Sequence, residues 1–251
     1  MILTIARTEL KRMFYSPLAW SVLAVVQFIL GLMFVIFIEN FITRLQLRFA
    51  GIEGAPGVTD SVVAPLYLWA SIMMLAVAPL LTMRLFSEER SAKTLSLLTS
   101  SPVSVTEVVL GKYLGLVGFL LIMLGMITLM PLSLAFATSL DWGKIAAGLL
   151  GLTLLVGSFG AAGMYLSSLT TQPIIAAVSS FGLLLVLVIL YISGSSQAAA
   201  SDLFVYVSHY SHFLSFVEGV FDTSDLAYYL LFIAGFLILT IRRLDNERLQ
   251  R

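Results

Sequence analysis

Hydrophobic positions along this chain form long continuous runs that are separated by short polar stretches. A helix needs about 20 apolar residues to cross a bilayer core of about 30 Å. Six runs reach that length: residues 17–38, 62–85, 108–140, 145–169, 174–192 and 226–241. None shows the period of two of a membrane β-barrel strand, so the pattern predicts an all-α polytopic membrane protein with six transmembrane helices.

The first residues are amphipathic rather than continuously apolar. Residues 1–15 place Leu10 and Phe14 on one helical side and Arg7 and Lys11 on another. This arrangement is typical of a helix that lies in the membrane interface with its basic side chains at the headgroups. An N-terminal interfacial helix is therefore predicted before the first span.

A second amphipathic stretch precedes the last span. Between residues 196 and 225, apolar positions recur at steps of three and four residues, and His209 and His212 lie on the polar side. The polar side is too extensive for a spanning helix. We predict an amphipathic element on the outer face of the membrane, either interfacial or re-entrant.

The polar stretch at residues 84–112 has the local signals of two helix starts. Ser87 is a candidate N-cap, with Glu88 and Glu89 in the first turn and Lys93 four residues after Glu89. Pro102 ends this helix. Ser104 and Glu107 then have the spacing of a capping box ahead of the third apolar run.

The same stretch carries a family resemblance. It combines the acidic pair with Arg90, Thr94, Leu95, Leu98, the run Pro102-Val103-Ser104 and the pair Gly111-Lys112. This pattern resembles the cytoplasmic coupling segment of ABC-2 type transporter permeases, especially the subfamily of the gliding-motility and nitrous-oxide-reductase-maturation permeases. The pair Ser16-Pro17, the turn from Ser168 to Pro173 and the tail from Ser208 to Arg243 extend the resemblance over nearly the whole chain.

The resemblance implies a fold, partners and site residues. It makes residues 1–251 a single permease domain whose coupling helix, at 87–101, seats in a groove of a separate ATP-binding subunit. Two such subunits would bind ATP and Mg²⁺, and a second permease subunit, identical or related, would complete the transporter. The implied docking residues are Ser87, Glu88, Glu89, Arg90, Lys93, Thr94, Leu95, Leu98 and Pro102.

Composition narrows the function further. The chain is 59% hydrophobic and 11% charged, a balance that excludes a soluble domain and makes membrane lipids its surroundings. It has no cysteine, which removes disulfides and thiolate metal sites. Its formal net charge is zero, so no nucleic-acid partner is expected.

Basic residues predict the orientation. If the N-terminus lies inside, the inner segments hold eleven of the 14 lysines and arginines. The outer segments hold three, namely Arg44, Arg48 and Lys144. The positive-inside rule then places both termini and residues 84–112 on the cytoplasmic side. The family resemblance implies that the membrane is the cytoplasmic membrane of a bacterial cell.

Candidate chemistry within the chain is sparse. The phosphate-binding pattern G-x-x-x-x-G-K-[ST] is absent, because Tyr113 follows Gly111-Lys112. We therefore expect no enzymatic activity and no cofactor in this chain. His209 and His212 are spaced to share a metal ion but lack an evident third ligand, so they are weak candidates. An ion-coupled secondary transporter is disfavoured, since no ionisable residue lies in the middle of a span.

Three functions remain open at this stage. The favoured one is the permease subunit of an ATP-driven transporter, with export as the expected direction and an outer-face or periplasmic partner left open. The alternative is a membrane scaffold that recruits a partner through residues 84–112 without transport. An intramembrane enzyme that uses Ser195 and His209 is the third, and the cargo is not identified by the sequence.

Overall fold

The structure of this chain is a computed structural model that describes residues 1–48, 56–92, 103–195 and 206–249. Every element within those ranges is helical. Six helical segments are long and apolar enough to cross a membrane: Pro17–Leu45, Thr59–Ser91, Val105–Phe136, Trp142–Leu169, Pro173–Tyr191 and Thr223–Arg248. The prediction of an all-α protein with six membrane-spanning helices is therefore confirmed.

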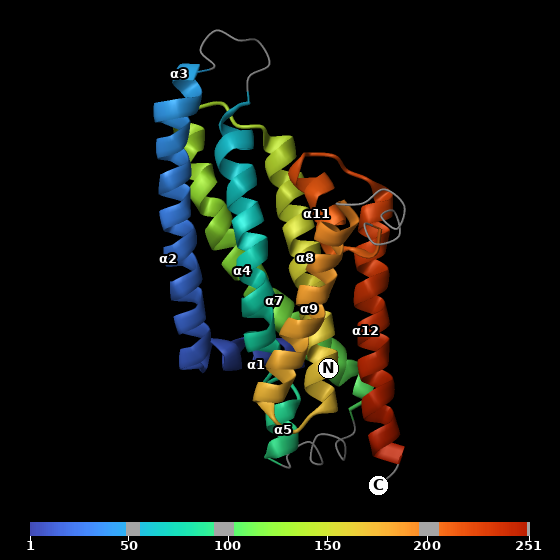
Figure 1. The fold of residues 1–251 in the computed structure, drawn as a ribbon. Coiled ribbons are helices and arrows are strands. Elements are labelled where there is room, and N and C mark those ends of the chain that lie inside the picture. Colours follow the sequence, from blue (N-terminus) through green and yellow to red (C-terminus); the bar gives the residue numbers. More distant parts are fainter. Residues whose placement is uncertain (49–55, 93–102, 196–205, 250–251) are drawn as a thin grey trace.

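The first helix does not run along the bundle. α1 (Ile2–Tyr15) lies crosswise at one end of the long helices, and α2 (Pro17–Asn40) then rises along one edge of the bundle (Figure 1). Ser16 separates the two helices with an extended backbone, and Pro17 begins α2, where the missing N–H of proline costs no hydrogen bond. The chain bends between α1 and α2 for this local reason.

The next elements return the chain to the end where α1 lies. The second candidate span combines the π-helical turn η2 (Thr59–Val63), α4 (Ala64–Thr82) and the short helix α5 (Ser87–Ser91). α2 reaches the far end through η1 (Phe41–Leu45) and α3 (Gln46–Arg48). Residues 49–55 between α3 and η2 lie outside the described ranges.

The third span begins with the predicted capping box. At the start of α7 (Val105–Leu132), the Ser104 hydroxyl accepts a hydrogen bond from the Glu107 N–H at 3.2 Å. The Glu107 carboxylate accepts one from the Ser104 N–H, also at 3.2 Å. The capping box is therefore confirmed, and the helix continues into the 3₁₀ turn η3 (Ser133–Phe136).

The fourth span is the centre of the molecule. α8 (Trp142–Leu169) contacts α4, α7, α9, α11 and α12. The most apolar stretch of α8 is 67% buried, against 17% for the corresponding stretches of α2 and α9. The last helices are α9 (Pro173–Ser195), α11 (His209–Val217) and α12 (Thr223–Leu249).

Glycines explain why α8 can hold so many neighbours. A Cβ at Gly148 would lie 2.7 Å from the Tyr67 ring, one at Gly151 would lie 2.5 Å from Phe216, and one at Gly163 would lie 2.2 Å from the Thr82 hydroxyl. Small residues let helices approach closely where lipid supplies no hydrophobic force between them. The glycines of α8 therefore serve tight packing.

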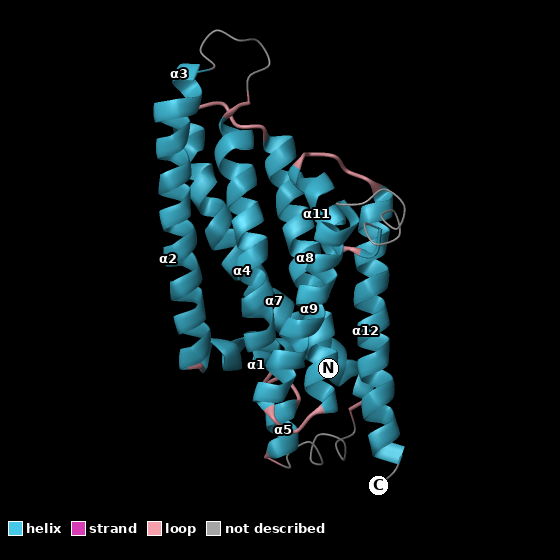
Figure 2. Ribbon diagram, viewed as in Figure 1, coloured by secondary structure: helices cyan, strands magenta, loops and turns pink. Residues whose placement is uncertain are grey.

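The two ends of the bundle differ in what they carry. Figures 1 and 2 show α1, α5 and both chain termini at one end, which we call the terminal end. The turns η1, η2 and η3 and the short helix α11 lie toward the other end, which we call the opposite end. α5, the described start of the predicted docking segment, thus lies at the same end as both termini.

Candidate functional site

The predicted docking segment begins directly after α4. α5 starts at Ser87 as predicted, but Ser87 is not its N-cap, because Phe86 occupies that position. The Ser87 hydroxyl instead donates a hydrogen bond to the Met83 carbonyl. The N-cap prediction is wrong for a local reason: the chain continues from α4 as a hydrogen-bonded turn, and the serine side chain folds back onto it.

A serine from α8 takes over the capping of α5. Ser167 is fully buried, and its hydroxyl accepts hydrogen bonds from the N–H groups of Phe86 and Ser87, both at 3.2 Å. It also donates a hydrogen bond to the Met83 carbonyl at 2.9 Å. The N–H groups at a helix start lack partners within the helix. Ser167 satisfies two of them, so α5 is fastened to the end of α8.

The two acidic residues of α5 face different surroundings. Glu88 is paired with Arg12 of α1 at 2.9 Å, and its side chain is 48% exposed. Glu89 is paired with Lys112 of α7 at 2.6 Å, and its side chain is 14% exposed. Glu88 is therefore about half exposed to solvent, whereas Glu89 is mainly an internal contact.

Lys112 is the centre of the internal contacts. Its side chain is 3% exposed, and its ammonium group lies 2.6 Å from Glu89 and 3.4 Å from Glu9. It also lies 5.4 Å from the centre of the Phe86 ring, within the range of a cation–π interaction. Arg12 contacts Glu9 at 3.8 Å and Glu89 at 3.4 Å. We call Glu9, Arg12, Glu88, Glu89 and Lys112 the charged junction.

Two glycines bring α1 close enough to α7 for this junction to form. A Cβ at Gly115 would lie 2.9 Å from the Ala6 carbonyl oxygen, and one at Gly111 would lie 2.7 Å from Ile5. The glycines flank Lys112 in the sequence, so the lysine points at α1 where the two backbones are nearest. α1 is thereby a packed part of the bundle as well as a crosswise helix.

A separate ion pair links α5 to the last helix. The Arg90 guanidinium lies 2.7 Å from the Glu247 carboxylate of α12, and their side chains are 15% and 23% exposed. Arg243 of α12 approaches the same carboxylate at 3.5 Å. α5 therefore contacts α12 in addition to α1, α7 and α8.

Part of the predicted docking set can be placed and part cannot. Ser87, Glu88, Glu89 and Arg90 lie in α5 or at its start, as described above. The remaining predicted residues lie outside the described ranges: Lys93, Thr94, Leu95, Leu98 and Pro102. The predicted helix over 87–101 is thus described only as far as α5 and Ala92, and the pairing of Glu89 with Lys93 is untested.

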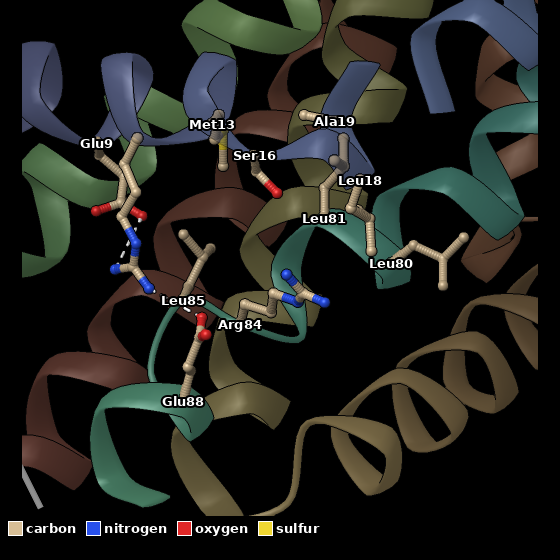
Figure 3. A pocket seen from close by; sticks show the side chains of 11 residues that line it. Glu9, Met13, Ser16, Leu18, Ala19, Leu80, Leu81, Arg84, Leu85 and Glu88 are labelled. Atoms are coloured by element: carbon tan, nitrogen blue, oxygen red, sulfur yellow. Dashed lines mark hydrogen bonds and ion pairs between the residues drawn. The ribbon is translucent and has the colours of Figure 1, made fainter. Parts of the chain in front are cut away.

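Two pockets border the charged junction. One, of about 360 Å³, is lined by residues of α1 and α7 together with Glu89. The other, of about 170 Å³, lies between the bend that joins α1 to α2 and the end of α4 (Figure 3). Glu9 and Arg12 line both pockets.

The histidines of the predicted outer-face element are buried, so their placement on a polar side is wrong. His209 is fully buried and His212 is 6% exposed. His212 lies 2.6 Å from the Asp225 carboxylate and 2.8 Å from the Tyr206 carbonyl oxygen. These internal partners draw both rings into the protein, where α11 packs against α8 and α12. The part of the predicted element at residues 196–205 lies outside the described ranges.

His209 has the environment of a neutral ring. The Tyr228 hydroxyl donates to the Val207 carbonyl at 2.7 Å, so His209 Nδ1 is the donor in its 2.8 Å contact with that hydroxyl oxygen. Burial, followed by the proximity of His212, lowers the pKa of His209 to about 3. Within the described residues, no group of three or more histidine, aspartate or glutamate side chains is arranged to hold a metal ion.

Sequence reasoning did not identify the residues that contact α5 and its start, namely Glu9, Arg12, Lys112, Ser167 and Glu247. Glu9 and Lys112 left a usable signal: each is a charged residue among positions expected to be apolar. Glu9 is the one acidic residue in the predicted interfacial helix, and Lys112 follows a glycine at the start of a membrane span. Ser167 left no such signal, because serines are common in membrane helices.

The comparison with known proteins agrees with this architecture. A family model described as ABC-2 family transporter protein matches residues 48–241, which is most of the chain. No curated protein matches the chain. The match covers five of the six candidate spans, α5 and the segment after it, so the chain is a membrane permease domain that belongs to the ABC-2 transporter family.

Proposed function

We propose that this chain is the permease subunit of an ATP-driven exporter in the bacterial cytoplasmic membrane. In this proposal α5 and the residues up to Pro102 dock onto a separate ATP-binding subunit, a partner that the family implies. The terminal end then faces the cytoplasm, as the distribution of basic residues indicates. The subfamily resemblance to gliding-motility and nitrous-oxide-reductase-maturation permeases belongs to the same proposal.

The observation that supports the docking role best is the way in which α5 is held. It is hydrogen-bonded to α8 through Ser167 and ion-paired to α1, α7 and α12 through Arg12, Lys112 and Glu247. A push on α5 therefore reaches four helices directly. A loop that merely connected two spans would not need these contacts.

The proposed assembly has two permease subunits and two ATP-binding subunits. ATP and Mg²⁺ bind to the ATP-binding subunits, whose closure displaces α5 and shifts the spans attached to it. Glu88 makes a polar contact to the partner, because its side chain is the more exposed of the acidic pair. Leu95 and Leu98 supply apolar contact and Pro102 holds the turn, as the family resemblance implies.

Charge reversal at Glu88 tests the docking role. In cells that produce this chain with its ATP-binding partner, Glu88→Lys is expected to reduce recovery of the complex about ten-fold, since a like-charge contact costs about 1.4 kcal/mol or more. Glu218→Lys, an exposed glutamate beyond α11, is the matched control and leaves recovery unchanged. Equal recovery and equal ATP turnover for Glu88→Lys and the unaltered chain would contradict the docking role.

A transport assay separates the permease from the scaffold alternative. The purified complex, reconstituted in vesicles, is expected to hydrolyse ATP and to move a cargo across the membrane. A complex that forms and hydrolyses ATP, but moves nothing from a cell extract across the vesicle membrane, would favour the scaffold.

A further inference from the structure

The smaller pocket at the terminal end has the composition of a lipid headgroup site. One wall comes from the bend between α1 and α2, with Met13, Leu18 and Ala19. The other comes from the end of α4, with Leu80 and Leu81. In Figure 3 most of these apolar side chains lie along the top and Leu80 lies at the right, with Arg84 and Glu88 below them and Glu9 at the upper left. The pocket thus has apolar walls and a charged side.

The charged side chains that line the pocket differ in whether they have ion-pair partners. Glu9 and Glu88 both lie against Arg12, at 3.8 and 2.9 Å, and Glu9 also contacts Lys112. Arg84 is exposed and forms no ion pair with any residue that the structure describes. In Figure 3 its guanidinium lies beneath Ser16 and Leu18 and points away from the Glu88 carboxylate. The donors of Arg84 are therefore available to an anion in the pocket.

The depth of the pocket matches the headgroup region of a membrane. Trp20, in the first turn of α2, is 55% exposed, and its indole N–H donates to the Phe14 carbonyl across the bend at 2.7 Å. Exposed tryptophans in membrane proteins gather where the acyl chains meet the headgroups. Leu80 on the opposite wall is also partly exposed. The pocket lies at this level, between a crosswise helix and the ends of two spans.

The volume indicates how much of a lipid can enter. The pocket has a volume of about 170 Å³, so it admits part of a headgroup, such as a phosphodiester, but not a whole lipid. The acyl chains would remain in the bilayer beside Leu18 and Leu80. Arginine suits this task because its planar fork of donors matches phosphate oxygens.

We propose that this pocket binds the headgroup of an anionic glycerophospholipid, with Arg84 donating to the phosphodiester and the walls at Leu18 and Leu80 contacting the start of an acyl chain. The neighbouring carboxylates of Glu9 and Glu88 disfavour groups of higher negative charge, so a singly charged phosphodiester is the best match. Glu88 belongs to this pocket and to the docking proposal, but lipid binding is measured without the ATP-binding subunit, so the two proposals can fail separately.

Native mass spectrometry of the whole chain in mild detergent tests this site. Short-chain phosphatidylglycerol is expected to remain bound to the unaltered chain, and Arg84→Gln is expected to weaken binding about ten-fold, the effect of losing roughly 1.4 kcal/mol. Arg7→Gln, at an exposed arginine of α1, is the matched control and keeps the affinity. Both variants are expected to keep the melting temperature of the unaltered chain, which is recorded in parallel to check that they are folded.

Competition separates a lipid from a free anion. Inorganic phosphate at millimolar concentration is expected to leave phosphatidylglycerol bound, because it makes no contact with the apolar walls. Displacement by phosphate would overturn the lipid assignment. Equal weakening by Arg84→Gln and Arg7→Gln, or equal binding of phosphatidylcholine and phosphatidylglycerol, would overturn the site itself.

Discussion

The terminal end and the opposite end of the bundle both bury polar side chains, but with different chemistry. At the terminal end, charged groups from α1, α5 and α7 meet, and Arg12 alone approaches three carboxylates at 2.9 to 3.8 Å. At the opposite end, the Tyr228 and Tyr229 hydroxyls each donate to a backbone carbonyl, and a neutral His209 lies against both rings. Charged groups at the terminal end each have several oppositely charged neighbours, whereas each tyrosine hydroxyl at the opposite end has one backbone acceptor.

This difference indicates how each end responds to displacement. A small shift of α5 lets Arg12 or Lys112 exchange one carboxylate for another, so the charged junction keeps most of its favourable interactions. A similar shift of α11 would break directional hydrogen bonds in a buried, mostly aromatic site, which costs about 1–3 kcal/mol for each group left unpaired. We infer that the charged junction tolerates a small shift of α5, whereas the Ser167 hydrogen bonds to α5 and the hydrogen bonds of the opposite end resist one.

The largest effect is expected when the buried cation of the charged junction is removed. Lys112→Met removes the nearest cation of Glu9 and Glu89, which keep longer contacts to Arg12 at 3.8 and 3.4 Å. The loss of the buried partner is expected to lower the free energy of unfolding by about 3 kcal/mol. Thermal and denaturant unfolding in detergent measure it. Lys144→Met is the matched control, because its 2.7 Å pair with Asp60 is 34% and 42% exposed, so its removal should change the stability little. Equal losses from both variants would remove the distinction between a buried network and an ordinary exposed ion pair.

The next largest loss of stability is expected from disturbing the packing of α4 on α8. A Cβ at Gly163 would lie 2.2 Å from the Thr82 hydroxyl, and Gly163 is one helical turn before Ser167. Gly163→Ala is expected to cost about 1–3 kcal/mol in the same unfolding assay, as overpacking does in other cores. Thr82→Ala in the Gly163→Ala background should recover part of the loss. Gly182→Ala, on α9, has no atom within 4 Å of the added carbon and should not destabilise the chain.

A smaller and pH-dependent effect is expected from His209. Its pKa is about 3 in the folded chain and about 6.5 when unfolded, so the unfolded chain binds an extra proton between these values. Stability should therefore fall as pH decreases from 6.5, by at most about 1.4 kcal/mol per pH unit. His209→Phe removes this contribution, so its melting temperature should depend less on pH between 6.5 and 4.5. An unchanged pH dependence would show that His209 is not buried as a neutral ring.

Most of the fold was predictable, because the bilayer imposes a length on every span. Runs of about 20 apolar residues leave few alternatives to transmembrane helices, and the Ser104 capping box is a signal confined to four residues. Ser87 shows the limit of local signals. An N-cap role for Ser87 would require its hydroxyl to face the first N–H groups of α5. Because the chain continues from α4 as a turn, the hydroxyl donates to the Met83 carbonyl instead.

The partners of the docking segment were less predictable, because they come from distant parts of the chain. Glu9 and Lys112 are separated by 103 positions, and Ser167 lies 81 positions from Phe86. No periodicity links such residues before the helices are packed. The buried histidines show the same effect: helical spacing places His212 on the polar side of α11, but only the fold brings Asp225 to it.

The most direct test of the account uses accessibility at α5. The chain contains no cysteine, so Ser91→Cys and Glu218→Cys each introduce a single thiol, at the exposed end of α5 and beyond α11 respectively. We expect a membrane-impermeant maleimide to label position 91 in the isolated chain and to label it much more slowly once the ATP-binding subunit is bound. Labelling of position 218 should not change. Equal labelling rates at position 91 with and without the ATP-binding subunit would contradict the claim that α5 is the docking element.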